Sequence, residues 1–256
     1  MKDLLALKGR RVLSQVYIRG PKEAAACEAA GVDLIVTENR GDIGAIREAA
    51  PDTFFTVGLL YGAHASVTET LRETYRLIGL GVDAIYCPQS VEYVAALARE
   101  AVPTVGHVGL IPYKSTWFGG FKAVGKTAAE ARRVYDSALA HQEAGAIAVE
   151  MEVVPQEMAA AISSRLEILT IGMGAGSGCD AQYLFSTDIL GDNEGHIPRH
   201  AKVYRNHRAE YERLHQDSID AFSEFAADVA SGAYPESGHS LVADPDEVAA
   251  FVAGLD

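Results

Sequence analysis

Two glutamates, Glu150 and Glu152, stand two residues apart in the apolar stretch AIAVEMEVVP at residues 146–155. The stretch is typical of a buried strand, and successive side chains of a strand point to opposite faces. Both carboxyl groups therefore share one face, while Val149 and Met151 share the other. Burying an ionised carboxylate costs free energy unless the group is paired or bound to a ligand. The two acids thus indicate a polar site on one face of this strand.

The chain around this stretch alternates short apolar segments with helical ones. The expected strands lie at residues 10–17, 33–37, 53–60, 83–87, 103–110, 146–152 and 167–173, with a weaker candidate at 181–185. This alternation predicts a parallel sheet. Seven or eight such units in about 190 residues fit an α/β protein with a single (β/α)8 TIM barrel better than a doubly wound sheet. We expect one barrel domain over residues 1–256, in which residues 198–256 form a mainly helical C-terminal extension.

In a barrel of this kind, catalytic side chains gather at the C-terminal ends of the strands. The expected strand ends bring together Tyr17, Glu38, Asn39, Gly58, Tyr61, Tyr86, Cys87, His107, Glu152 and Met173. This rule selects Glu152 over Glu150, because Glu152 is nearer the mouth. His107 has small neighbours in VGHVG, and both a functional and a structural role stay open for it.

Two glycine-rich segments follow expected strands. IGMGAGSG at residues 171–178 lacks the spacing of a phosphate-binding loop or of a complete dinucleotide fingerprint. We interpret it as a place of close backbone packing at one end of the barrel. FGGFKAVGK at residues 118–126 carries Lys122 and Lys126, and two interpretations stay open, a lid over a charged substrate or a solvated loop.

Composition excludes several classes of partner. The net charge of −13 argues against nucleic acid and anionic membranes, because the overall field repels both. The N-terminus shows no signal-peptide pattern, and no run of about 18 apolar residues predicts a membrane span. Three cysteines without a C-x-x-C pair fit a reducing cytoplasm. We therefore expect a cytoplasmic protein that acts on a small-molecule substrate.

Six motifs between residues 103 and 241 occur in the order and spacing of one enzyme family. They are GHVGLIPY, FGGFKAVGKTAAEA, EAGAIAVEMEVVPQEMAAAISSRL, TIGMGAGSGCDAQYLFSTDILG, PRHAKVY and YPESGHSL. Together they resemble the ketopantoate hydroxymethyltransferase family. Toward the N-terminus, EAAGVDLIV and the strand rhythm continue the resemblance.

The resemblance implies a (β/α)8 barrel of the phosphoenolpyruvate mutase/isocitrate lyase superfamily, assembled as a homo-oligomer. It implies transfer of a hydroxymethyl group from methylenetetrahydrofolate to 3-methyl-2-oxobutanoate, with magnesium chelating the 2-oxo acid and favouring its enolate. The glutamate of the family's E-x-V-P motif is the proposed base, and it matches Glu152. The histidine of the GH-x-G motif, near the substrate, matches His107.

The metal site that the resemblance implies is altered in this chain. The family segment V-G-D-S reads VTEN, so Glu38 and Asn39 replace a metal-binding aspartate and a substrate-contacting serine. The second metal aspartate falls on Gly58. The segment K-L-E-G-G holds a substrate-binding lysine and a metal glutamate, whose places are taken by Tyr86 and Pro88. Magnesium wants several hard oxygen ligands, so Glu38 alone predicts a weak magnesium site or none.

The leading hypothesis is a ketopantoate hydroxymethyltransferase-like transferase, with Glu152 as general base and His107 as a second catalytic residue. The expected substrate contacts are Glu38, Asn39, Tyr86, Lys122 and Glu150. The alternatives are a metal-independent aldolase, lyase or hydrolase acting on a different substrate, and a non-catalytic metabolite-binding relative. Glu150 replaces an apolar residue of the family. It either shares a proton with Glu152, pairs with an inward-pointing cation, or packs with an ordered water.

Overall fold

The first of two compact units in this chain is a closed barrel. The computed structural model describes residues 2–255, and the units span Met1–Arg205 and Asn206–Asp256. In the first unit, eight parallel strands pair in chain order and close on themselves. The expected (β/α)8 TIM barrel is therefore confirmed, including the weak strand candidate at residues 181–185. That the whole chain forms one domain stays a prediction.

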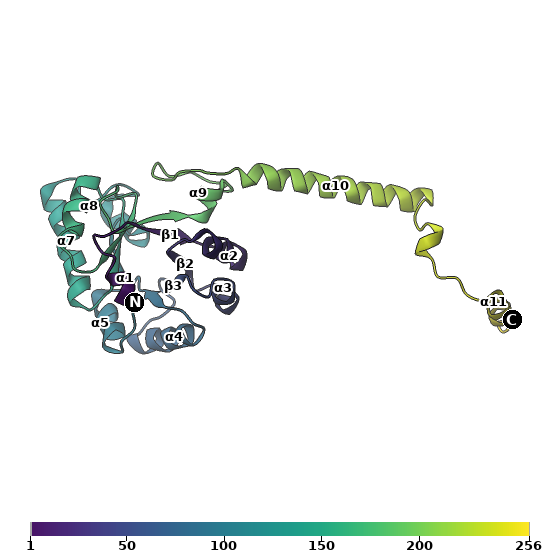
Figure 1. Ribbon diagram of the computed structural model, residues 1–256, viewed down its shortest axis with the longest axis horizontal. Helices are drawn as coiled ribbons and strands as arrows, with labels where there is room; N and C mark the ends of the chain where they lie inside the picture. Colours follow the sequence, from purple (N-terminus) through teal and green to yellow (C-terminus); the bar gives the residue numbers. More distant parts are fainter. Residues whose placement is uncertain (1, 256) are drawn as a thin grey trace. The chain divides into compact units, whose positions relative to one another are not determined.

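Helices and strands alternate through this unit, except that β8 follows β7 without a helix between them. The strands are β1 (Leu13–Tyr17), β2 (Leu34–Glu38), β3 (Phe54–Gly58), β4 (Ala84–Tyr86), β5 (Thr104–Gly109), β6 (Ala148–Glu152), β7 (Leu169–Met173) and β8 (Ala181–Phe185). The helices are α1 (Lys2–Leu5), α2 (Pro21–Ala30), α3 (Ile43–Ala49), α4 (Val67–Gly79), α5 (Val91–Arg99), α6 (Ser115–Phe118), α7 (Ala128–Glu143), α8 (Gln156–Ser163) and α9 (Ser186–Leu190), with a 3-10 turn η1 (Pro112–Lys114). Figure 1 shows the helices on the outside of the strands.

Helix α7 shows how local sequence sets an element that supports the site. Thr127 and Glu130 form a capping box at its start, which satisfies backbone N–H groups that lack helical partners. Its buried residues recur at helical spacing and are Ala131, Val134, Ala138 and His141. This apolar stripe lets α7 pack against β5 and β6.

The alternation of side chains along β6 divides the two acids from the apolar residues as expected. Val149 and Met151 belong to the core between the strands and the outer helices, whereas Ala148 belongs to the core inside the barrel. Glu150 and Glu152 continue the inward series that begins with Ala148. Both carboxyl groups therefore enter the barrel, and the polar face predicted for this strand is the barrel interior.

The glycine-rich segment after β7 returns the chain to the next strand without a helix. A Cβ on Gly178 would lie 2.4 Å from the Cβ of Ala160, and one on Gly176 would lie 2.2 Å from the Cβ of Gln156. Only glycine permits so close an approach to α8, and Gly176 also has a positive φ. The interpretation of this segment as close backbone packing is therefore confirmed.

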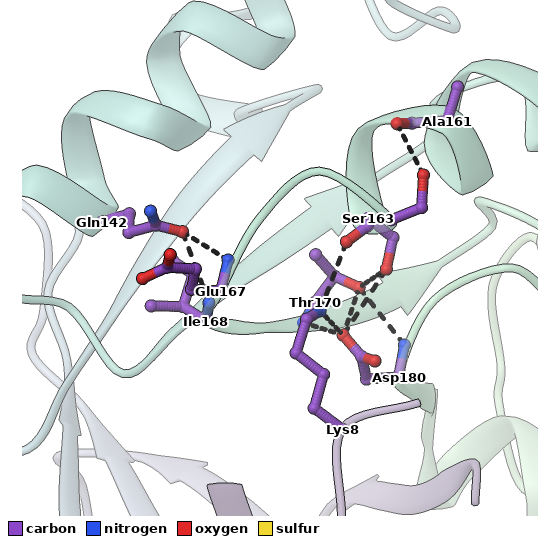
Figure 2. A network of polar contacts seen from close by, with 9 residues as sticks. Lys8, Gln142, Ala161, Ser163, Glu167, Ile168, Thr170 and Asp180 are labelled. Carbon is purple, nitrogen blue, oxygen red and sulfur yellow. Dashed lines mark hydrogen bonds and ion pairs between the residues drawn. The ribbon is translucent and has the colours of Figure 1, made fainter. Parts of the chain in front are cut away.

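A buried polar network closes the barrel end at which the strands begin (Figure 2). The carboxylate of Asp180 accepts hydrogen bonds from the backbone N–H (2.8 Å) and the hydroxyl (2.9 Å) of Thr170. Nζ of Lys8 lies 2.6 Å from the same carboxylate, and the hydroxyls of Ser163 and Thr170 are 2.6 Å apart. Because Asp180 is paired and hydrogen-bonded, we assign it a structural role. The catalytic residues are expected at the opposite end of the barrel, where the strands end.

The second unit is helical and has no core of its own. It comprises α10 (His207–Ser231), the 3-10 turn η2 (Ser237–His239) and α11 (Pro245–Ala253). None of its described residues is buried, and the exposed apolar residues on α10 include Tyr211, Leu214, Phe222, Phe225 and Val229. A homo-oligomer would offer such residues a partner surface, and it stays a prediction. Within residues 2–255, no helix combines the length and the apolar character needed to cross a membrane.

Candidate active site

The C-terminal ends of the strands enclose a cavity of about 410 Å³. Its lining includes Tyr17, Glu38, Gly58, Tyr86, His107, Glu150, Glu152, Met173 and Tyr183, so every strand of the barrel contributes. Tyr61 and Tyr113 stack at its rim with ring centroids 3.7 Å apart. The cavity therefore lies where the barrel rule predicts an active site. Aromatic side chains form its wall, and two acids lie at its floor.

Glu152 and His107 meet inside this cavity. Nε2 of His107 lies 3.2 Å from Oε2 of Glu152, and both side chains are buried. The two groups are not aligned for a hydrogen bond, so Nε2 has no hydrogen-bond partner among the described residues. The other ring nitrogen, Nδ1, is hydrogen-bonded to the hydroxyl of Tyr86. Burial lowers the pKa of His107, but the neighbouring carboxyl groups of Glu150 and Glu152 outweigh burial and leave that pKa above its usual value.

Glu150 lies one inward position deeper than Glu152 and opposite His107 in the β5–β6 register. The ion pairs among residues 2–255 include none between Glu150 and a lysine or arginine. Burial raises the pKa of Glu150 to about 7; the proximity of His107 opposes this rise and that of Glu152 adds to it. An acid in this setting holds a proton near neutral pH.

Replacing Glu150 by Gln should change how stability depends on pH. Because the pKa of Glu150 is raised on folding from 4.5 to about 7, its contribution is complete below pH 4.5 and is lost as pH rises through about 7. This loss amounts to roughly 3 kcal/mol above both values. Glu150→Gln should therefore gain stability relative to wild type between pH 5 and pH 8, measured by chemical denaturation. Glu157→Gln, on the exposed surface of α8, should show no such trend, and parallel curves for all three proteins would contradict the assignment.

The backbone around Glu152 is unusually constrained. Val153 has a φ of 49°, a conformation that a β-branched residue rarely adopts, and its N–H donates to the carbonyl of Met173 at 2.8 Å. Gly109 has a φ of 88°, and a Cβ there would lie 2.3 Å from the carbonyl oxygen of Glu152. Leu110 donates its N–H to the same oxygen at 2.8 Å. Strain of this kind persists where the surroundings fix one arrangement, and here it fixes the position of Glu152.

Gly109→Ala should therefore displace Glu152 as well as strain the backbone. The strain alone costs roughly 1–3 kcal/mol, and the contact with the Glu152 carbonyl adds to it. The matched control is Gly120→Ala, where φ is 105° but nothing lies within 4 Å of the added Cβ. We expect both variants to lose thermal stability and only Gly109→Ala to lose most of its catalytic rate. Equal rates for the two variants would show that Gly109 does not position Glu152.

Glu38 and Asn39, two of the predicted substrate contacts, lie in different places. The carboxylate of Glu38 is half-exposed at the cavity edge, and its Oε2 lies 2.9 Å from Nε of Arg40. Asn39 is turned toward α4, where its Nδ2 donates to Glu73 at 2.6 Å and its Oδ1 accepts from Arg76 at 3.0 Å. Glu38 therefore lies at the site, whereas the side chain of Asn39 is hydrogen-bonded to α4 outside it.

Lys122 lies away from this cavity. It lines a second cavity of about 750 Å³ that also reaches Glu152. Glu152, Pro198 and His200 line both cavities. Glu152 is therefore accessible from two sides.

The positions that the resemblance assigns to magnesium do not fit that ion here. Gly58 offers no ligand, and a Cβ on it would lie 3.3 Å from the ring of Tyr86, which fills the space of the missing side chain. Pro88 lacks a ligand side chain, and Glu38 faces Arg40. Within residues 2–255, only His107, Glu150 and Glu152 bring three potential ligand atoms together, within 4.8 Å of one another. That group is small and includes a nitrogen, whereas magnesium prefers an octahedron of hard oxygens.

The cavity residues that were not selected from the sequence include Tyr183, Asp188 and His200. Tyr183 is buried on β8 and faces the cavity, and the inward alternation of that strand would have identified it had the strand been assigned firmly. Asp188 and His200 follow β8 and also line the cavity. No local pattern marks them, because the fold alone brings the segment after β8 over the mouth.

The chain is similar in sequence to known enzymes of one family. Residues 28–237 match the family model described as ketopantoate hydroxymethyltransferase. The 3-methyl-2-oxobutanoate hydroxymethyltransferase of Deinococcus radiodurans is 38% identical over 245 residues, covering 86% of this chain and 84% of that protein. The enzyme of the same name from Thermus thermophilus is 34% identical, covering 94% and 98%.

The fold also resembles solved barrels of distant sequence. A phosphonopyruvate hydrolase in complex with oxalate and Mg²⁺ aligns with a TM-score of 0.52 and 12% identity, over 93% of this chain and 92% of that one. This likeness shows the barrel architecture alone. By its match to the family model and by its relatives, the chain belongs to the ketopantoate hydroxymethyltransferase family and has a hydroxymethyltransferase-like function.

Proposed function

We propose that this chain adds a hydroxymethyl group to C3 of 3-methyl-2-oxobutanoate, with Glu152 as the general base. The single observation that carries this proposal is the position of Glu152, buried at the mouth of the barrel within 3.2 Å of His107. The proposed substrate is the one in the name of the relatives, which are 34–38% identical to this chain. The cavity of about 410 Å³ has room for a small 2-oxo acid.

The proposed steps use the two sides of Glu152. The C3–H bond breaks, its proton passes to the Glu152 carboxylate, and the electron pair moves to the C2 oxygen to give an enolate. C3 then attacks formaldehyde, free or released from its carrier by hydrolysis. The C–C bond forms as the C=O π bond of formaldehyde opens, and the C2 carbonyl re-forms. The proton held by Glu152 returns to the oxygen of the new hydroxymethyl group. One carboxyl group thus serves as base and then as acid.

We propose that the one-carbon donor occupies the second cavity. Lys122, Lys126 and Arg199 line it, and none of them forms an ion pair among the described residues. In a chain with a net charge of −13, three such cations beside Glu152 favour an anionic carrier. Methylenetetrahydrofolate, expected from the resemblance, stays a prediction within this class. A cytoplasmic location likewise stays a prediction.

Lys122→Ala should weaken binding of the donor more than binding of the 2-oxo acid. Loss of one charged contact to an anionic carrier should raise the KM for the donor about 10-fold. The KM for 3-methyl-2-oxobutanoate should remain within about 2-fold, because Lys122 does not line the first cavity. Initial rates with each substrate varied in turn measure both constants. Lys22→Ala, on exposed α2, is the control, and an unchanged donor KM in Lys122→Ala would remove the lysine from this role.

Product formation tests the proposed function. The protein is incubated with 3-methyl-2-oxobutanoate and either formaldehyde or methylenetetrahydrofolate, and the hydroxymethylated product is followed by NMR and mass spectrometry. Product that depends on the protein supports the proposal. Loss of the C3 proton to solvent without product from either donor would instead indicate divergence toward aldolase chemistry with another carbonyl partner. The absence of both exchange and product would contradict the proposal.

A further inference from the structure

The C2 oxygen gains negative charge when the substrate is enolised, and something in the cavity must stabilise it. The positions that would hold magnesium carry Gly58, Pro88 and an arginine-facing Glu38, so the usual stabiliser does not fit. We propose that His107 and Glu150 stabilise the enolate oxygen by hydrogen bonds, in place of a metal ion. This inference rests on the proposed function and names the groups that make it possible without magnesium.

Tyr86 gives His107 the protonation pattern that this role needs. The ring of Tyr86 occupies the space beside Gly58, and its hydroxyl is hydrogen-bonded to Nδ1 of His107. Burial together with the neighbouring Glu150 holds the pKa of Tyr86 well above its usual value, so its hydroxyl keeps its proton. Nε2 then carries a proton in either state of the ring: in the neutral imidazole because the hydroxyl donates to Nδ1, and in the imidazolium because both nitrogens are protonated. Nε2 has no hydrogen-bond partner among the described residues, so its N–H is free for a ligand oxygen.

Glu150 supplies the second donor. Its carboxyl group is buried beside His107 and Glu152, all three offering polar atoms within 4.8 Å of one another. No lysine or arginine pairs with it among residues 2–255, so an ionised Glu150 would be a buried charge and a second negative charge beside Glu152. A neutral carboxylic acid avoids that repulsion and offers an O–H to the cavity.

Among residues 2–255, His107 is the one group near Glu150 that favours its ionised form. The titratable groups that face it are His107 from β5, Glu152 from β6, Tyr86 from β4, Tyr183 from β8 and Tyr113 from η1. Burial holds the pKa values of the three tyrosines above their usual value, so they remain neutral. Only His107 offers positive charge, and it is shared with Glu152.

The two glutamates of β6 thus have separate roles set by their depth. Glu152, nearer the mouth, takes the C3 proton as a carboxylate. Glu150, one inward position deeper, donates its proton in a hydrogen bond and keeps it throughout. Two carboxyl groups with different protonation states are a recurrent solution for acid and base chemistry at one pH. The buried strand β6 therefore carries two acids with different roles, Glu152 as the base and Glu150 as a hydrogen-bond donor.

The test compares Glu150→Leu, Glu150→Gln and wild type by hydrogen–deuterium exchange at C3 of 3-methyl-2-oxobutanoate, with EDTA present. Removing the donor in Glu150→Leu should slow exchange about 10²–10³-fold, as for loss of one oxyanion donor. The amide of Glu150→Gln still donates, so its rate at pH 6 should stay within about 10-fold of wild type. Wild-type exchange should fall as Glu150 ionises above pH 7, and Glu150→Gln should lack that fall. Glu157→Gln should match wild type throughout.

A spectroscopic measurement tests Glu150 without reference to activity. The infrared difference spectrum between wild type and Glu150→Gln at pH 6 should contain the C=O band of a protonated carboxylic acid, and its absence would overturn the inference. Exchange that is abolished by EDTA and restored by a divalent metal would also overturn it, as would a Glu150→Leu variant that exchanges as fast as wild type. Absence of exchange in wild type itself is a different result, because it contradicts the proposed function and removes the inference with it.

Discussion

Glu152→Gln should lower the rate of enolisation of 3-methyl-2-oxobutanoate by about 10²–10⁴-fold, the range for removal of a positioned general base. The substitution keeps the size of the side chain and removes only its ability to accept the C3 proton. Glu152 is buried and has His107 Nε2 at 3.2 Å, whereas Glu38 and Asp188, which also line the cavity, are engaged by Arg40 and Asn193. Glu150, the nearest acid, is protonated in this account. Substrate binding should be retained, and calorimetric titration with the 2-oxo acid measures it separately from the rate.

The control for this variant is Glu157→Gln, which changes an exposed acid five residues further on. It should keep the wild-type rate. A Glu152→Gln protein that binds substrate and turns it over at more than about a tenth of the wild-type rate would remove Glu152 as the base. The alternative of a non-catalytic metabolite-binding relative predicts binding by both proteins and turnover by neither, because binding alone does not need the carboxylate.

His107→Leu should lower the same rate by about 10²–10³-fold, since it removes one of the two donors to the enolate oxygen. His107→Gln should recover part of this loss, because an amide N–H can donate from a similar place. The effect should fall on kcat more than on KM, because charge on the oxygen develops only as the proton leaves. Steady-state kinetics of the two variants separate these constants.

A matched variant separates chemistry from packing at this position. Tyr86→Phe keeps the ring that packs beside Gly58 and removes the hydroxyl that is bonded to His107 Nδ1. It should fold as wild type and show a smaller loss of rate than His107→Leu, with an altered pH profile because the tautomer of His107 is no longer fixed. If His107→Leu and His107→Gln both keep the wild-type kcat, His107 has only a structural role.

The barrel could be predicted from the sequence because its signal is repeated. Seven of the strands follow apolar runs that are rich in β-branched residues, and helix ends such as the one before Ala146 are followed by glycine, so the rhythm is visible seven times, with a weaker eighth strand at residues 181–185. The place of Glu152 and His107 followed from the rule that barrel chemistry lies at strand ends. The inward direction of Glu150 followed from the two-residue period of the strand.

Other features depend on contacts between distant residues and were not predictable. The strand ends identified Tyr86, but only the fold shows that its ring fills the space at Gly58 and that its hydroxyl meets His107. The engagement of Asn39 with Glu73 and Arg76 on α4 likewise has no local signature. Lys122 was expected at the substrate, and only the fold separates its cavity from the one that contains His107.

The central claim is that Glu152 enolises a 2-oxo acid in this barrel without a metal ion. The most direct test is NMR of 3-methyl-2-oxobutanoate in D2O with wild type and Glu152→Gln, each in magnesium and in EDTA. Exchange of the C3 proton requires no one-carbon donor, so it isolates this step. We expect wild type to exchange at similar rates in both media and Glu152→Gln to exchange about 10²–10⁴-fold more slowly. Exchange that requires magnesium, or that survives the substitution, would contradict it.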